Sequence, residues 1–90
     1  MADVAEVVVY RGLLASVAKR YIVFEAYPVD TNDTITIGEL TVLTGVTGAT
    51  LYRLDTGALV TCTTTGTSNV ITVTNAGLVD VPVVGIASGN

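Results

Sequence analysis

Few residues in this chain have the types and spacing that catalysis needs. Asp55 lies in the segment Leu54-Asp55-Thr56-Gly57-Ala58. A carboxylate can serve hydrolysis when a second one lies close, because the pair shares one proton and splits into acid and base. The chain has no histidine and a single cysteine, Cys62, so a thiol or hydroxyl nucleophile would lack its usual activating base. An enzymatic interpretation therefore depends on Asp55.

The segment around Asp55 resembles the Asp-Thr-Gly-Ala signature of retropepsin-type aspartic proteases. Val83-Val84-Gly85-Ile86 is similar to the element that backs the catalytic loop in that family. The resemblance implies an all-β homodimer in which two copies of Asp55 are catalytic. The family, however, has a flap hairpin and several strands between the two elements, a wider separation than this chain has. Asp-Thr-Gly is also a common hairpin turn, because glycine takes positive φ. The spacing favours the turn, and the homodimeric protease is an alternative.

A second group of oxygen ligands lies in the acidic segment around residue 30. Asp30, Asn32 and Asp33, with Glu39 nearby, have the side chains that calcium prefers. The segment lacks the length and the later acidic ligand of an EF-hand, and Asx residues also form turns through their own backbone. We therefore expect a solvated turn. Without histidine, zinc and most transition metals lose their usual ligands, so we expect no metal and no cofactor.

Composition limits the remaining functions. The chain has 90 residues, so we expect one domain, and its single cysteine excludes an intrachain disulfide. Charged residues make up 13% of it, against about 25% in typical globular chains, which suggests that part of its surface is covered by a partner. Four basic residues and a net charge of −4 argue against nucleic-acid binding. The acidic start lacks the basic region of a signal peptide, and no apolar run reaches the roughly 18 residues of a membrane span.

Short β-prone runs separated by turn residues indicate an all-β fold. Turn signals recur about every 8–12 residues, as in a small β-sandwich or barrel of about 6–8 short antiparallel strands. Alternation places Ile22, Phe24 and Ala26 on one face of the first clear strand. The predicted strands are 21–27, 34–37 resuming at 40–42, 51–54, 59–63, 70–74 and 79–87.

Residues 1–18 are open to more than one interpretation, and residues 19–90 form the predicted compact β domain. Val7, Tyr10 and Leu14 have helical spacing, whereas the run 7–10 is strongly β-prone. We favour a strand or extended arm over residues 5–10, followed by a short helical or irregular piece. The segment could dock on a neighbouring chain or serve as the first strand of the same core.

Two segments are predicted to meet partners. Pro82 cannot donate a hydrogen bond within a sheet, and proline in strands is found at edges or bulges. We therefore place the last strand at an edge, or with the side of Pro82 facing solvent or a partner. This strand and the apolar N-terminal segment could pair with another chain through main-chain bonds. The predicted interface residues are Val7, Val8, Val9, Tyr10, Leu13, Leu14, Val81, Pro82, Val83 and Val84.

Residues 19–89 resemble small decoration or cement proteins of tailed bacteriophages. The similarity lies in the Thr/Val/Gly-rich strands, the scarcity of charge and an ending such as Val81-Pro82-Val83-Val84-Gly85. The resemblance implies a non-enzymatic structural protein, often a homotrimer, that binds the major capsid protein on the outside of the lattice. It implies that the chain is made in the host cytoplasm and resides in the virion.

A third interpretation is a spike or adhesin head that binds carbohydrate. Tyrosine rings can stack on sugars, and the chain has four of them but no tryptophan. Tyrosines on half-buried strands more often serve a core or an interface. The candidate platforms are Tyr10, Tyr21, Tyr27 and Tyr52.

Overall fold

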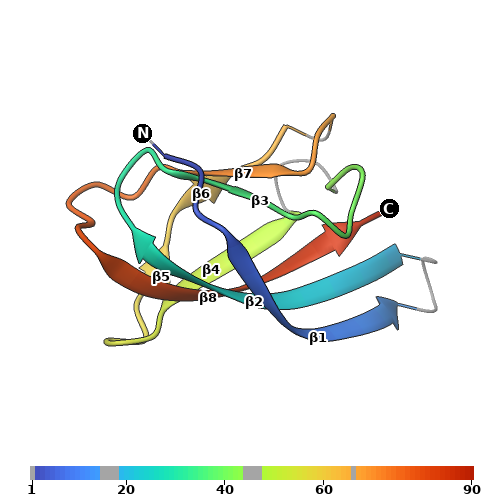
Figure 1. Ribbon diagram of the computed structural model, residues 1–90, viewed down its shortest axis with the longest axis horizontal. Coiled ribbons are helices and arrows are strands. Elements are labelled where there is room, and N and C mark those ends of the chain that lie inside the picture. Colours follow the sequence, from blue (N-terminus) through green and yellow to red (C-terminus); the bar gives the residue numbers. More distant parts are fainter. Residues whose placement is uncertain (1, 15–18, 44–47, 66) are drawn as a thin grey trace.

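Strand alternation governs the whole structure, a computed structural model that describes residues 2–14, 19–43, 48–65 and 67–90. The described residues form eight strands and no helix, which confirms the predicted all-β class. The strands make two antiparallel sheets packed face to face as a sandwich (Figure 1). In the part of the chain that is described, no helix is long and apolar enough to span a membrane.

The larger sheet has five strands and the smaller sheet has three. The order in the larger sheet is β1 (Glu6–Leu14), β2 (Lys19–Val29), β8 (Val81–Gly89), β4 (Ala49–Arg53) and β5 (Leu59–Val60). The order in the smaller sheet is β3 (Thr34–Thr36), β7 (Val70–Val73) and β6 (Cys62–Thr63).

The core lies between the two sheets and is built from alternate residues of each strand. Phe24, the only phenylalanine of the chain, is completely buried at its centre. The predicted inward face of β2 is confirmed, because Ile22 and Ala26 are buried beside it. The smaller sheet and the other strands contribute Ile35, Leu51, Val60, Ile71, Val73, Val83 and Ala87.

Gly85 makes room for the phenylalanine ring. It lies opposite Phe24 on β2 and opposite Leu51 on β4. A Cβ atom on Gly85 would come within 2.4 Å of a Leu51 methyl group and 2.6 Å of the Phe24 ring. Real Cβ atoms do not approach other atoms so closely, so the packing of the ring against β8 requires glycine at this position.

The predicted edge position of the last strand is wrong. β8 lies in the middle of the larger sheet, between β2 and β4. Pro82 is accommodated there because the register of β2 shifts between Ala26 and Val29, so the missing donor coincides with a bulge. The same bulge contains Pro28, preceded by a cis peptide bond. β2 therefore runs on to Val29, beyond residue 27, where the predicted strand ends.

The N-terminal segment belongs to the same fold. β1 pairs antiparallel with β2 from Glu6 to Leu14, with a bulge at Val9. Before it, Val4 is buried, and its amide donates to the carbonyl of Thr34 on β3. Residues 6–14 are thus a first strand of the sheet, one of the two predicted alternatives, and the helical spacing is not used. The rest of the expected helical or irregular piece, 15–18, lies outside the described residues.

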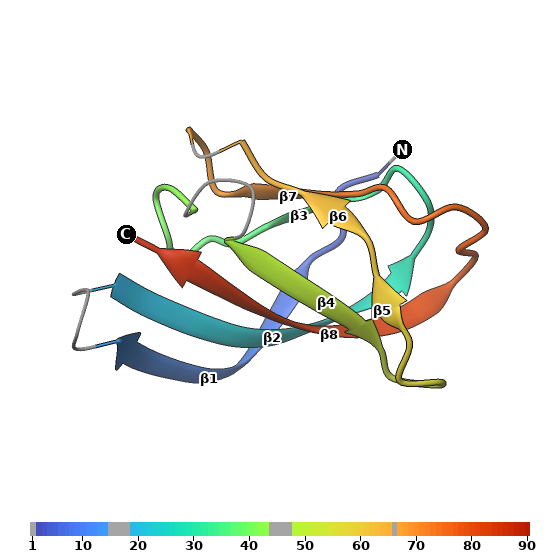
Figure 2. The ribbon, with the colours of Figure 1, turned by 180° about the vertical axis from the view of Figure 1, so that it is seen from behind.

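Two of the predicted strands, 59–63 and 40–42, differ in the structure. The predicted strand 59–63 is divided, because β5 pairs with β4 in the larger sheet and β6 pairs with β7 in the smaller one (Figure 2). The predicted strand 40–42 does not form. Instead, a turn closes with the amide of Leu40 donating to the carbonyl of Ile37, and the buried Leu40 and Leu43 contribute to the core.

Gly85→Ala tests whether the core depends on the glycine in β8. We expect a loss of about 1–3 kcal/mol in the free energy of unfolding, since the added methyl group must displace Phe24 or Leu51. Urea denaturation followed by circular dichroism measures it. The matched control is Gly38→Ala, where the added Cβ atom would lie 3.7 Å from a Glu6 oxygen, an ordinary contact distance. We expect its change in the free energy of unfolding to stay within about 0.5 kcal/mol. Equal stability of the two variants would contradict the packing described.

Candidate functional site

The outward face of the larger sheet is unusually apolar. Side chains alternate between the two faces of a strand, and the positions that point away from the core are mostly hydrophobic or aromatic. We call this surface the apolar face. It consists of Val7 and Tyr10 from β1, Tyr21, Val23, Glu25 and Tyr27 from β2, Pro82, Val84 and Ile86 from β8, Thr50, Tyr52 and Leu54 from β4 and its turn, and Leu59 from β5.

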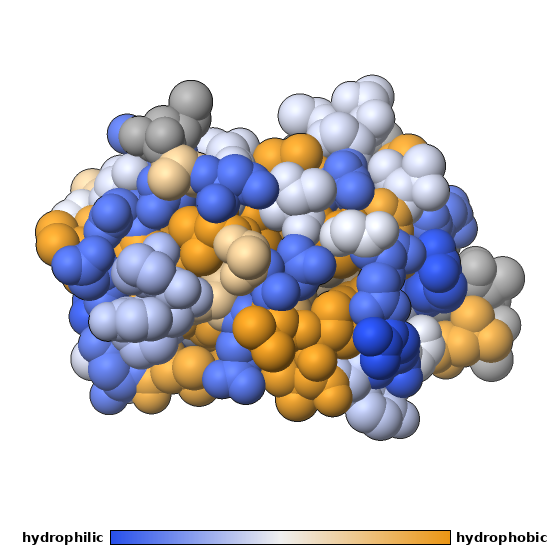
Figure 3. Space-filling view, viewed as in Figure 1, coloured by the Kyte–Doolittle hydropathy of each residue, from blue (hydrophilic) through white to orange (hydrophobic). Residues whose placement is uncertain are grey.

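These side chains are exposed to a degree that is uncommon for their types. Val7 and Tyr27 are each 65% exposed, and Ile86 is 52% exposed. In Figure 3, hydrophobic groups reach the surface along the lower side of the molecule, where β1 and β2 lie. Contiguous exposed apolar surface of this kind marks interaction sites in soluble proteins.

The outward face of the smaller sheet has the opposite character. Thr34 and Thr72 are paired across β3 and β7, and Thr63 lies opposite Thr72 on β6. Asp3 accepts hydrogen bonds from the hydroxyls of Thr34, at 3.0 Å, and Thr36, at 3.1 Å. Threonines therefore give this sheet a polar outward face. The sandwich has one polar outer face and one apolar outer face.

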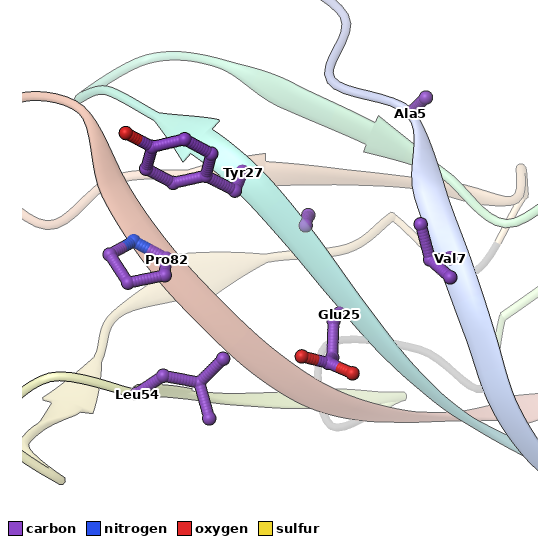
Figure 4. A pocket seen from close by; sticks show the side chains of 7 residues that line it. Ala5, Val7, Glu25, Tyr27, Leu54 and Pro82 are labelled. Carbon is purple, nitrogen blue, oxygen red and sulfur yellow. The ribbon is translucent and has the colours of Figure 1, made fainter.

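Hollows open on the apolar face. One of about 250 Å³ lies at the end where β1, β2, β8 and the turn after β4 meet (Figure 4). Its lining includes Val7, Tyr27, Leu54 and Pro82, with the Glu25 side chain between Leu54 and Val7. A smaller hollow of about 130 Å³ lies between Val23, Thr50, Tyr52, Val84 and Ile86. Concave places between large apolar side chains suit the protruding side chains of a partner.

All four tyrosines lie on the apolar face. The Tyr21 ring covers Gly12 on the neighbouring strand, where a Cβ atom would come within 2.3 Å of two ring carbons and the hydroxyl oxygen of Tyr21. Its centroid lies 6.0 Å from that of Tyr10, with the rings tilted. Desolvation, and secondarily the proximity of Tyr10, raise the pKa of Tyr21. The paired rings give one end of the face a large, rigid aromatic surface.

The structure divides the residues predicted for an interface. Val7, Tyr10, Pro82 and Val84 lie on the apolar face. Val81 and Val83, by contrast, are buried in the core, and Val8 packs against it, because these three occupy inward positions of their strands. Val9 and Leu13 are exposed, Val9 at the bulge and Leu13 opposite Arg20 on the other side of the sheet. The side chain of Leu14 lies outside the described residues.

Most members of the apolar face were not predicted as interface residues. Val23 and Leu59 belong to no motif, Leu54 and Ile86 belong only to the segments that resemble aspartic proteases, and the tyrosines suggested sugar binding. The available signal was in β2, where the outward positions Tyr21, Val23 and Tyr27 are as apolar as the inward ones. A strand that is apolar on both faces is typical of a sheet covered on both sides.

Asp55 lies in an exposed hairpin turn between β4 and β5. Gly57 has φ of 78° and its amide donates to the carbonyl of Arg53 at 2.8 Å. The Arg53 guanidinium donates to both carboxylate oxygens of Asp55, Nε to Oδ1 at 3.0 Å and Nη2 to Oδ2 at 2.9 Å. This hydrogen-bonded pair lowers the pKa of Asp55. The geometry is that of the predicted turn.

In the acidic turn after β2, the aspartate carboxylates accept hydrogen bonds from backbone amides. Asp33 is buried and accepts from the amides of Ala2 and Asp30, both at 2.9 Å. Asp30 Oδ1 accepts from the amide of Asp80 at 2.6 Å. Asn32 takes the left-handed φ of 73° that Asx residues tolerate. The predicted turn is confirmed, but Asp33 within it is buried and not solvated. Among the described residues, no group of three or more His, Cys, Asp or Glu side chains is placed to hold a metal ion.

Cys62 is half-buried and packs against the core. Burial raises the pKa of its thiol, which keeps the thiol protonated and makes it a poor nucleophile. This is the environment of a small hydrophobic residue.

No protein-family model, curated protein or solved structure matches this chain.

Titration of Asp55 distinguishes a carboxylate in a hairpin turn from one that shares a proton with a second aspartate. We expect one carboxyl titration with a pKa below the ordinary value of aspartate, moving upward in Arg53→Gln because the guanidinium that favours the ionised form is gone. NMR of the side-chain carboxyl carbon across pH measures it. Glu39, paired with Arg11 and also lowered in pKa, serves as the control that should not move. Two coupled titrations, with one pKa raised, would instead indicate paired aspartates.

Proposed function

We propose that this chain is a non-enzymatic structural protein that binds a protein lattice through its apolar face. One observation carries the proposal, namely the contrast between the two outer faces of the sandwich. The threonine-covered face of the smaller sheet is suited to water. The apolar face carries exposed aromatic and aliphatic side chains with almost no charge, the composition of the centre of a protein interface.

The sequence resemblance to phage decoration proteins supplies the biological setting of the proposal. In that setting the lattice is the major capsid protein, the chain sits on the outside of the virion, and the threonine face points to solvent. Binding by a broad sheet face needs neither a catalytic group nor a cofactor. Its affinity comes from burying hydrophobic surface, at about 25 cal/mol per Å² before the costs of association.

β1 supports an additional contact between copies of the chain. It is an end strand of the larger sheet and nine residues long, whereas β5 at the other end has two. A long end strand presents backbone donors and acceptors to which another strand can add. We therefore include in the proposal the homotrimer that the resemblance implies. The copies contact one another at β1, and the apolar face remains free to bind the lattice.

Carbohydrate binding is the second candidate, favoured by the position of all four tyrosines on one face. Sugars, however, require hydrogen-bonding groups beside the stacking rings, and most neighbours of these rings are valine, isoleucine, leucine or proline. The apolar neighbours favour a protein partner.

Ile86→Glu tests whether the apolar face binds the capsid. The ligand is a shell assembled from the coat protein of the genome that encodes this chain, prepared without the chain, and sedimentation through a sucrose gradient measures binding. We expect the wild type to cosediment and Ile86→Glu to lose at least about tenfold in affinity, because it places a charge in a desolvated contact. The control Thr63→Glu adds the same charge to the threonine face and should bind like the wild type. A coat protein that is absent from the genome, or equal binding by both variants, would refute the proposal.

The oligomeric state tests the contact at β1. Native mass spectrometry of the wild type should give three copies of the 9.3 kDa chain. Val9→Pro, which removes a backbone donor at the bulge of the end strand, should shift the population toward monomer. Circular dichroism of the variant provides the check on folding. A wild-type monomer across the micromolar range would remove the trimer from the proposal.

A further inference from the structure

Glu25 occupies an exceptional position on the apolar face. Its cross-strand neighbours are Val7 on β1 and Val84 on β8, and along β2 the next outward positions are Val23 and Tyr27. Apolar side chains thus surround it in all four directions. It forms no ion pair or side-chain hydrogen bond with any described residue. A solvated charge would ordinarily lie at the rim of an interaction surface, and this one lies inside it.

If a partner covers the apolar face, the Glu25 carboxylate needs a counter-charge or water. A carboxylate that is removed from water without a partner is strongly destabilising, whereas a paired and hydrogen-bonded one is tolerated. Whatever covers the apolar face must therefore bring a cation to Glu25 or leave it wet. Its position in the lining of the 250 Å³ hollow (Figure 4) shows where the cation would enter.

A second copy of this chain is a poor source of the cation, because the chain has eight acidic and only four basic residues. Of its three arginines, Arg11 pairs with Glu39 and Arg53 pairs with Asp55. Arg20 lies opposite Gly89, which is buried, and so belongs to the side of the sheet away from the apolar face. Lys19, the only lysine, begins β2, and its side chain lies outside the described residues. Charge complementarity thus points to a different partner.

We propose that the hollow at Glu25 receives a lysine or arginine side chain projecting from the protein that covers the apolar face. This inference rests on the proposed lattice-binding function and specifies the chemistry of the partner. The aliphatic stem of the incoming side chain packs against Val7, Leu54 and Pro82, and its charged end reaches the Glu25 carboxylate. The Tyr27 ring in the same lining offers its face to the cation. A long side chain with an apolar stem and a charged end matches both properties of the hollow.

The test uses n-butylguanidinium as a probe of the arginine side chain, with n-pentanol as its uncharged counterpart. Titrations followed by NMR should give saturable shifts at Val7, Glu25 and Tyr27 with the guanidinium. We expect binding to weaken about threefold in Glu25→Gln, the effect of an exposed ion pair, and to be retained in Glu25→Asp. The matched control is Glu39→Gln, which removes one negative charge elsewhere and should bind like the wild type. Equal binding by wild type and Glu25→Gln, or shifts with n-pentanol of the same strength, would overturn the inference.

Capsid binding by the same variants separates this inference from the proposed function. If both hold, Glu25→Gln loses at least about tenfold in affinity for the shell, because the cation of the partner is buried without its counter-charge, while Glu39→Gln does not. Wild-type binding that is unchanged in Glu25→Gln would leave the function standing and refute the cation site. Self-association of the wild type that is lost in Ile86→Glu would assign the apolar face to a second copy of the chain. That result would also refute the cation site.

Discussion

The pairing of β2 with β8 is the contact on which the rest of the structure depends. These two long strands run antiparallel from Arg20 opposite Gly89 to Val29 opposite Val81. Their inward side chains include Phe24 and Val83 and form the centre of the core, while their outward side chains form the middle of the apolar face. Because alternate residues of one strand pair build both surfaces, a change of register by one residue would exchange them. A shift in the register of this strand pair would therefore alter the core and the candidate site together.

Glycine at two positions allows this pair of strands to carry large side chains on both faces. Gly85 admits the Phe24 ring on the inside, and Gly12 admits the Tyr21 ring on the outside. An aromatic ring that covers a cross-strand glycine shields backbone that would otherwise be exposed. In each case a residue with no side chain is matched to one with a large side chain, which maintains close packing across the sheet.

Much of the fold could be predicted from the sequence because alternation and turn chemistry are local. The inward face of β2, the turn at Asp30–Asp33 and the hairpin at Asp55–Gly57 all follow from residues within a few positions of one another. The central position of β8 could not be predicted, because it depends on a bulge in β2, more than fifty residues away, that accommodates Pro82. The division of residues 59–63 between two sheets likewise depends on long-range pairing. The candidate site was predicted only in part, since an apolar outward position such as Ile86 looks the same in sequence as a core position.

The passage of Leu59–Thr63 from one sheet to the other has a mechanical consequence. A single extended segment joins the edge of the larger sheet, at β5, to the edge of the smaller sheet, at β6, with only Thr61 between them. The segment 2–6 likewise connects β3 to β1, through the hydrogen bonds of Ala2 and Val4 with Thr34. A load applied to the larger sheet therefore reaches the smaller one along covalent backbone as well as through side-chain packing. These two connections, at different strand edges of the sandwich, resist sliding of the layers past one another.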